Sequence, residues 1–133
     1  MTQHATGPFD VKITPLDPAF KTEDTSIARM SIDKLFHGDL EASSKGEMLT
    51  AATSVKGSAG YVAIERVTGK LDGRTGSFTL QHTATMTRGT PQLNIIVVPD
   101  SATGQLQGLT GTMNIIITNG QHSYDFAYTL PSK

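Results

Sequence analysis

Glu65 and His82 are the two side chains whose types and placement best suit chemistry. A carboxylate beside an imidazole can hold the ring in one tautomer and tune it for proton transfer. Both belong to residues 60–82, GYVAIERVTGKLDGRTGSFTLQH, which alternate on either side of Asp72-Gly73. This pattern predicts a β-hairpin with a two-residue turn.

The predicted register places the two groups on one face of the hairpin. Counting outward from the turn pairs Glu65 with Leu80. The same count pairs Ala63 with His82, which makes Glu65 and His82 diagonal neighbours with Cα atoms about 7–8 Å apart. A three-residue turn would put them on opposite faces. A contact that only satisfies two half-buried polar groups is the competing interpretation.

The same face holds further candidates for ligand contacts. Tyr61 could donate a hydrogen bond to a ligand carbonyl, although a barrel tyrosine more commonly packs with its hydroxyl at the rim. The hairpin partners of this face are mostly apolar. The predicted ligand-binding residues are Tyr61, Glu65, Phe78, Leu80, His82 and Tyr124, and the catalytic candidates are Glu65 and His82.

Arg29 and Glu47 are second-tier candidates. Arg29 is either the partner of Glu47 or Glu65, or a surface residue, and the surface interpretation is favoured. The four histidines show no i, i+2 or i, i+4 spacing typical of a metal site, so we predict neither a metal nor a cofactor. His37 falls in a predicted turn and His4 in a predicted N-terminal tail.

The alternation of residue types predicts that the candidate residues are held by short strands. Alternation predicts strands over residues 9–15 and 26–36, a turn at 37–38, and a strand from 39 toward 53 with a bulge at 45–46. Residues 16–25 are expected to form a loop with a helical turn possible, and another loop lies near 56–57. Asn119-Gly120 predicts a second hairpin, with His122, Tyr124, Phe126 and Tyr128 on one face.

Two patterns bear on closure and assembly. The motif Thr-Gly-x-Leu-x-Gly-x-Thr-Gly occurs at residues 68–76 and 103–111, and it is either one bent corner built twice or two unrelated turns. Residues 93–98 and 113–117 are apolar on both faces, and a subunit interface is the simplest cover for them. We therefore expect a homo-oligomer, with a dimer favoured and a trimer possible.

Composition limits the class of protein. The 133 residues are expected to form a single β-barrel domain, residues 1–133, with residues 1–7 a flexible N-terminus. Cysteine is absent, net charge is −1, and no basic stripe occurs, which argues against disulfides, thiol chemistry and nucleic-acid binding. No signal peptide or apolar stretch of membrane-spanning length is seen, so we expect no membrane association and a cytoplasmic location. About eight strands predict an all-β fold, a closed barrel or a sandwich.

Four stretches also carry a resemblance to a known family. They are GDLEASSKGEML (38–49), GSAGYVAIERVTGKLDGRTGSFTLQHTATM (57–86), VVPDSATGQLQGLTG (97–111) and HSYDFAYTL (122–130). The chain resembles a family of small bacterial proteins known as domain-of-unknown-function family 3224. That resemblance implies a small antiparallel eight-stranded β-barrel similar to plant allene oxide cyclase and dirigent proteins, usually oligomeric, and it implies no activity.

Three functions remain open on the sequence. The first is a binding protein that holds a small hydrophobic molecule in the barrel interior. The second is a cyclase or isomerase in which the shaped cavity positions an apolar substrate, and Glu65 or His82 supplies a proton or a charge. The third is a structural or interaction protein whose barrel is filled by side chains. The sequence leaves undecided whether the protein is an enzyme.

Overall fold

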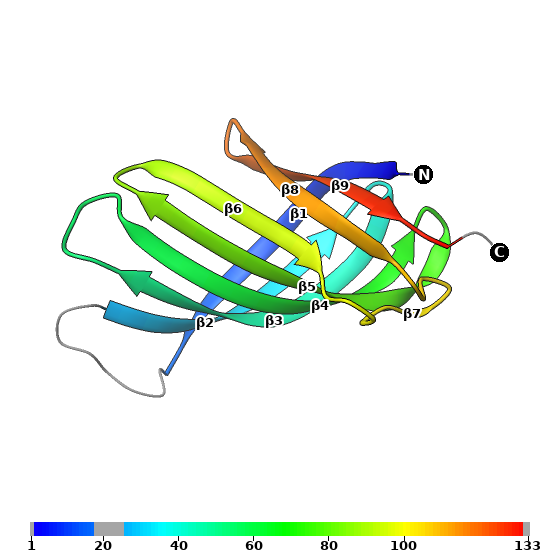
Figure 1. The fold of residues 1–133 in the computed structure, drawn as a ribbon, viewed down its shortest axis with the longest axis horizontal. Helices are drawn as coiled ribbons and strands as arrows, with labels where there is room; N and C mark the ends of the chain where they lie inside the picture. The colour runs from blue at the N-terminus through cyan, green and yellow to red at the C-terminus, as the bar shows by residue number, and fades with distance from the viewer. Residues whose placement is uncertain (1, 18–25, 132–133) are drawn as a thin grey trace.

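The computed structural model describes residues 2–17 and 26–131, which form an all-β fold. Eight strands close into an antiparallel barrel and a ninth, short strand is added to it (Figure 1). Among the described residues there is no helix with the length and apolar character needed to span a bilayer. The strands are β1 (Gln3–Leu16), β2 (Ser26–Phe36), β3 (Leu40–Ala52), β4 (Ala59–Leu71), β5 (Arg74–Thr87), β6 (Thr90–Val97), β7 (Thr103–Gly104), β8 (Thr110–Thr118) and β9 (Gln121–Thr129).

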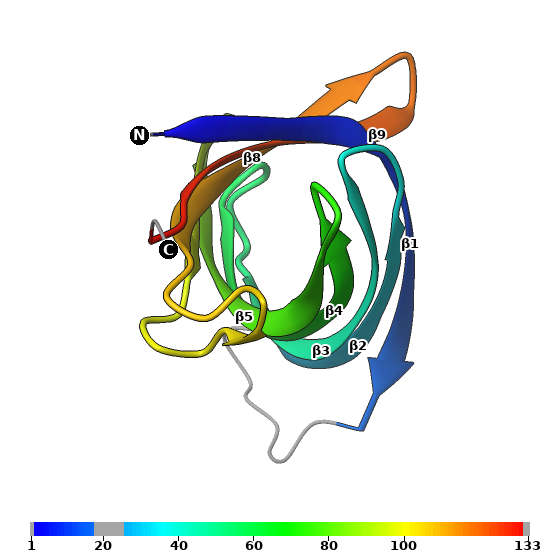
Figure 2. The same ribbon diagram turned by 90° about the vertical axis from the view of Figure 1, so that its right-hand side faces the viewer.

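The barrel closes in the order β4-β3-β2-β1-β9-β8-β6-β5, and β5 pairs back with β4. Seen from one end, the strands form a ring (Figure 2). The first strand contributes to this closure along most of its length, because residues 3–8 pair with β9 and residues 9–16 pair with β2. The prediction of a flexible segment over residues 1–7 is therefore wrong for residues 3–7. Met1 and most of the predicted loop at 16–25 lie outside the described residues.

Three two-residue turns fix the register of the hairpins. Asp72-Gly73, Arg88-Gly89 and Asn119-Gly120 all have positive φ at both positions, from 47° to 93°. That is the geometry of type I′ turns, whose twist matches the twist of paired strands. The Asp72-Gly73 turn pairs Glu65 with Leu80 and Ala63 with His82, as predicted.

The structure corrects one sequence prediction about glycines and decides between two alternatives for another. The pairing of β3 with both neighbours runs without interruption through Gly46, so residues 45–46 form no bulge. The two copies of the repeat differ, because residues 68–76 form the β4–β5 hairpin whereas residues 103–111 form β7, the turns after it and the start of β8. Their contact is direct, since β7 pairs with Gly76 and Ser77 of β5.

The barrel is packed with side chains toward the end that carries the β4–β5 turn and β7. Phe78 stacks on Phe126 with ring centroids 5.6 Å apart, and Phe126 stacks on Tyr128 at 5.5 Å. Leu106 and Leu109, from the turns after β7, are buried in the same cluster. The second copy of the repeat therefore helps to fill this end of the barrel.

Two tyrosines of β9 tie the turns at this packed end. The Tyr124 hydroxyl donates to the carbonyl of His37 at 2.6 Å and accepts from the amide of Leu40 at 2.8 Å. The Tyr128 hydroxyl donates to the carboxylate of Asp72 in the β4–β5 turn. These bonds anchor two hairpin turns to a strand from the far end of the sequence.

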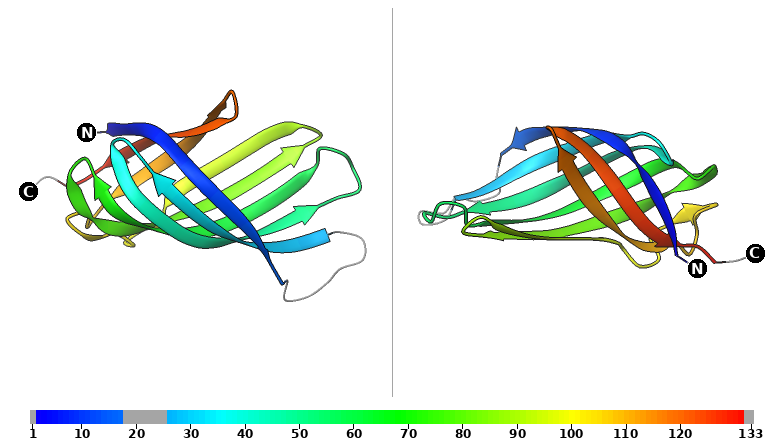
Figure 3. Two further views of the ribbon diagram at one scale, coloured as in Figure 1. Left: turned by 180° about the vertical axis from the view of Figure 1, so that it is seen from behind. Right: turned by 90° about the horizontal axis from the view of Figure 1, so that it is seen from above.

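The seam between β6 and β8 is the most weakly paired in the barrel. Among the described residues it contains one bridge, between Ile96 and Thr112, whereas the neighbouring pairs run over many residues. From this bridge the two strands diverge toward the β8–β9 turn (Figures 1 and 3). The barrel is thus closed at one end and widens at the other.

Candidate ligand-binding site

A network of four polar side chains lies inside the barrel, centred on Glu65. Its Oε2 accepts hydrogen bonds from Lys34 Nζ at 2.8 Å and His82 Nε2 at 2.5 Å, and its Oε1 accepts one from Ser44 Oγ at 2.8 Å. Glu65 has no exposed surface and His82 is 3% exposed. The structure therefore brings the two predicted residues together and adds two that the sequence analysis missed.

The charge state of Glu65 follows from its surroundings. Burial alone would raise the pKa of this carboxyl, but the hydrogen bond from His82 and the charge of Lys34 outweigh it and lower the pKa from 4.5 to about 2. Glu65 is therefore ionised at neutral pH. An ionised carboxylate can only accept hydrogen bonds, so His82 must donate from Nε2.

Lys34 is held in the interior by more than its ion pair. Its ammonium group lies 5.2 Å from the ring centroid of Phe9 and 5.7 Å from that of Phe36, within the range of cation–π attraction. One signal in the sequence could have identified it, because Lys34 shares its strand face with Ile32 and Phe36. Alternation alone therefore places a lysine on an otherwise apolar, inward face.

Gly46 makes room for the network. It lies opposite Glu65 in the β3–β4 ladder, and a Cβ atom built on it would lie 2.6 Å from Glu65 Cα. Real Cβ atoms do not approach another carbon so closely. Glycine within a strand commonly marks such a close approach of backbones, and here it brings β3 against the strand that carries Glu65.

His82 carries one buried atom without a partner. Within the described residues, Nδ1 of His82 has no hydrogen-bond partner and is shielded from solvent. The two nitrogens of an imidazole ring point in different directions, so with Nε2 bound to Glu65, Nδ1 points away from that carboxylate. Tyr61 is the nearest aromatic neighbour, with its ring centroid 6.2 Å from that of His82.

The packed interior ends one step beyond His82. Ala63, His82 and Ile95 pair across three strands and are 1–3% exposed. At the next inward position, where Ala84 pairs with Tyr61 and Leu93, the exposure of Leu93 is already 41%. His82 therefore lies at the boundary between the packed and the open halves of the barrel.

The open half contains a cavity of about 450 Å³, which we call the cup. Most of its wall comes from inward-facing positions of β3 to β6 and from the end of β8. These positions include Thr50, Ala59, Tyr61, Ala84, Met86, Pro91, Leu93 and Ile117. The wall is mainly apolar, and it includes Tyr61 but not His82, whose ring lies beside that of Tyr61.

The remaining predicted residues have other surroundings. Phe78 and Leu80 are fully buried in the packed half, and the Tyr124 hydroxyl is occupied by backbone groups. The structure therefore places Tyr61, Glu65 and His82 together near the cup and places Phe78, Leu80 and Tyr124 in the packed core.

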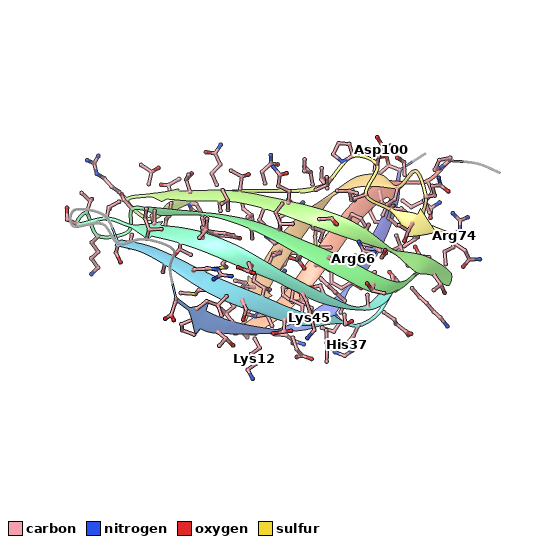
Figure 4. All side chains as sticks on the ribbon, turned by 90° about the horizontal axis from the view of Figure 1, so that it is seen from below. Lys12, His37, Lys45, Arg66, Arg74 and Asp100 are labelled. Atoms are coloured by element: carbon pink, nitrogen blue, oxygen red, sulfur yellow. The ribbon has the colours of Figure 1, made fainter. Side chains whose placement is uncertain are left out.

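The second-tier residues lie on the outer surface. Arg29 Nε donates to Glu47 Oε1 at 2.6 Å, and both side chains are substantially exposed. This hydrogen bond lowers the pKa of Glu47 and raises that of Arg29. His37 pairs with Asp10 at 3.0 Å, and its label in Figure 4 lies with those of Lys12 and Lys45 along the outside of the barrel. In residues 2–17 and 26–131, no cluster of three or more His, Asp or Glu side chains suits a metal ion.

Comparison with known proteins identifies the family. The family model described as "Protein of unknown function (DUF3224)" matches residues 5–128. A crystal structure of a protein of unknown function from this family, from Shewanella oneidensis MR-1, shares 52% sequence identity over 100% of both chains, with a TM-score of 0.96. No curated protein matches the chain. This chain belongs to the DUF3224 family.

Proposed function

We propose that the protein binds a small molecule in the cup, with an apolar body against the wall and a polar group at His82. The observation that carries this proposal is the unpartnered Nδ1 of His82, whose ring lies beside that of Tyr61 in the wall of the cup. Leaving a buried acceptor unsatisfied costs about 1–3 kcal/mol. A ligand that supplies the missing hydrogen bond would recover part of that cost.

The size and lining of the cup support a small apolar ligand. Its volume of about 450 Å³ falls within the range of small-molecule sites, which are typically apolar with a few placed polar groups. Met86 lines the cavity, and its flexible thioether can adapt to differently shaped ligands. The cup also argues against a barrel filled by side chains throughout.

Methyl NMR of labelled methionine tests binding with simple probe molecules in place of the natural ligand. The protein would be titrated with propylbenzene, para-propylphenol and para-propylbenzoate. We expect the Met86 methyl signal to shift with at least one probe, because Met86 lines the cup. The Met113 signal serves as the control and should stay unchanged, because Met113 is 2% exposed within the packed core.

Two results would contradict the proposal. One is the absence of any shift at Met86 with all three probes up to their solubility limits. The other is an equal shift of Met86 and Met113, which would indicate a change in the whole fold rather than occupation of the cup.

Proton-transfer catalysis, as in a cyclase or isomerase, is a second candidate, and one specific observation favours it. The 2.5 Å hydrogen bond between Glu65 and His82 orients the imidazole and would stabilise the imidazolium formed if Nδ1 took a proton. A ketone such as propyl phenyl ketone would then exchange its α-hydrogens with heavy water, because Nδ1 removes an α-proton, exchanges it with the solvent and returns a deuteron to the same carbon. The exchange should require His82 and be lost in His82→Ala, and equal exchange by both proteins would exclude this role.

A further inference from the structure

We propose that the polar group recognised beside Tyr61 in the cup is an uncharged hydroxyl, which donates to His82 Nδ1 and accepts from the hydroxyl of Tyr61. This proposal rests on the proposed function and names the class of ligand: apolar alcohols or phenols. It follows from the hydrogen-bonding capacity of His82 and Tyr61 and from the charges inside the barrel.

The acceptor character of Nδ1 is set by Glu65. That carboxylate accepts from Lys34, Ser44 and His82 at once, so Nε2 of the His82 ring carries a proton. In the neutral imidazole this leaves Nδ1 as a bare acceptor. A ligand group that only accepts, such as a ketone or an ether, would leave Nδ1 unsatisfied.

The charges of the interior favour an uncharged group. Lys34 and Glu65 are the two charged side chains within the packed interior of the described strands, and they form an ion pair. Two other inward positions carry side chains that can bear a charge. Arg74 is exposed beside the β4–β5 turn, and His122 lies against Phe9 with ring centroids 5.4 Å apart. A carboxylate or ammonium ligand would therefore bring an unpaired charge to the buried surroundings of His82, which is costly.

Tyr61 provides the complementary donor. Burial and the nearby charge of Glu65 raise the pKa of its phenol, so the hydroxyl keeps its proton. Its ring lies next to that of His82, and Tyr61 itself lines the cup. A hydroxyl is a small neutral group that both donates and accepts through one atom, so it can satisfy Nδ1 and Tyr61 together.

Four probes on one skeleton separate the alternatives by calorimetry near neutral pH. They are para-propylphenol, its methyl ether para-propylanisole, para-propylbenzoate and propylbenzene. We expect the phenol to bind about tenfold more tightly than the ether, which has lost its donor. We expect the benzoate to bind no better than propylbenzene.

Variants of Tyr61 and His82 test whether these two residues cause the preference for the phenol over the ether. In Tyr61→Phe and in His82→Ala, the advantage of the phenol over the ether should shrink severalfold, while propylbenzene still binds. Tyr61→Phe removes only a hydroxyl, so it remains informative if His82→Ala fails to fold. Gln81→Ala is the matched control, because Gln81 neighbours His82 on β5 but faces outward.

The outcomes distinguish the inference from the proposed function. Equal binding of phenol and ether, or strongest binding of the benzoate, would overturn the hydroxyl inference and leave ligand binding intact. An unchanged phenol preference in Tyr61→Phe and His82→Ala would also overturn it. Failure of all four probes to bind would contradict the proposed function itself.

Discussion

Glu65 makes the folded state sensitive to acid. Its pKa is lower in the folded protein, about 2, than the ordinary value of 4.5, so the ionised form stabilises the fold. The contribution is complete above about pH 4.5 and is lost as the pH falls toward 2. By linkage it amounts to about 3 kcal/mol. Urea unfolding at a series of pH values should show this loss.

Replacing Glu65 tests the origin of that loss. Glu65→Gln should lower the free energy of unfolding at neutral pH by about 3–5 kcal/mol, because Lys34 is left buried without its counter-charge. The variant should also lose less stability than the original protein between pH 4.5 and 2. Glu41→Gln, an exposed change on β3, is the control and should leave both quantities nearly unchanged. A similar acid response in the original protein and in Glu65→Gln would refute this assignment.

At the level of single residues, the sequence predicts part of the network. Glu65 and His82 are joined by one hairpin with an unambiguous turn, so counting from that turn brings them together. Lys34 and Ser44 lie on β2 and β3, and their contact with Glu65 depends on the pairing of β3 with β4 across a longer loop. The unpartnered state of Nδ1 depends on three-dimensional packing, which alternation of residue types does not specify.

Among the elements, the contact between β3 and β4 at Gly46 is the most sensitive to substitution. A methyl group at Gly46 would collide with the backbone of Glu65, so Gly46→Ala should destabilise the fold by about 1–3 kcal/mol. Gly60→Ala is the matched control on β4, since its nearest neighbour would be a carbonyl oxygen at an acceptable 3.4 Å. Thermal unfolding of both variants measures the difference, and equal stability would show that β3 can move away freely.

The elements were predicted best where turn chemistry is local. Asp72-Gly73 and Asn119-Gly120 are recognisable because type I′ turns require residues that tolerate positive φ. The repeat does not predict a shared structure, because the conformation of each copy depends on the segments around it. Residues 68–76 are flanked by two long strands and form a hairpin, whereas residues 103–111 pack Leu106 and Leu109 into the core. Residues 3–8 of the N-terminal strand were missed because their pairing partner is β9, at the other end of the chain, whereas residues 9–15 were predicted as a strand.

For the whole molecule, the predicted closed, all-β, eight-stranded antiparallel barrel is confirmed. The division into a packed half and an open half was not predictable, because it depends on where β6 and β8 separate.

The seam between β6 and β8 also bears on assembly. We propose that the protein forms a homo-oligomer through the outer face of β8 near the seam, where Ile116 is 46% exposed.

Light scattering at micromolar concentration measures that assembly. We expect a dimer or a larger species, and we expect Ile116→Lys to give a folded monomer because a buried charge at an apolar interface is unfavourable. Thr68→Lys, at an exposed and outward-facing position on β4, is a control for added charge. A monomeric original protein would contradict the proposal.

Nitrogen NMR of the protein with isotope-labelled histidine is the most direct test of hydroxyl binding at His82, because it reports on Nδ1 itself. Near neutral pH we expect a proton on Nε2 of His82 and a bare Nδ1, whose signal moves on titration with para-propylphenol. The signals of His4 and His37, which are paired on the outer surface, should stay unchanged. A proton on Nδ1 of the ligand-free protein, or a His82 signal that is unaffected while the phenol binds, would contradict hydroxyl binding at His82.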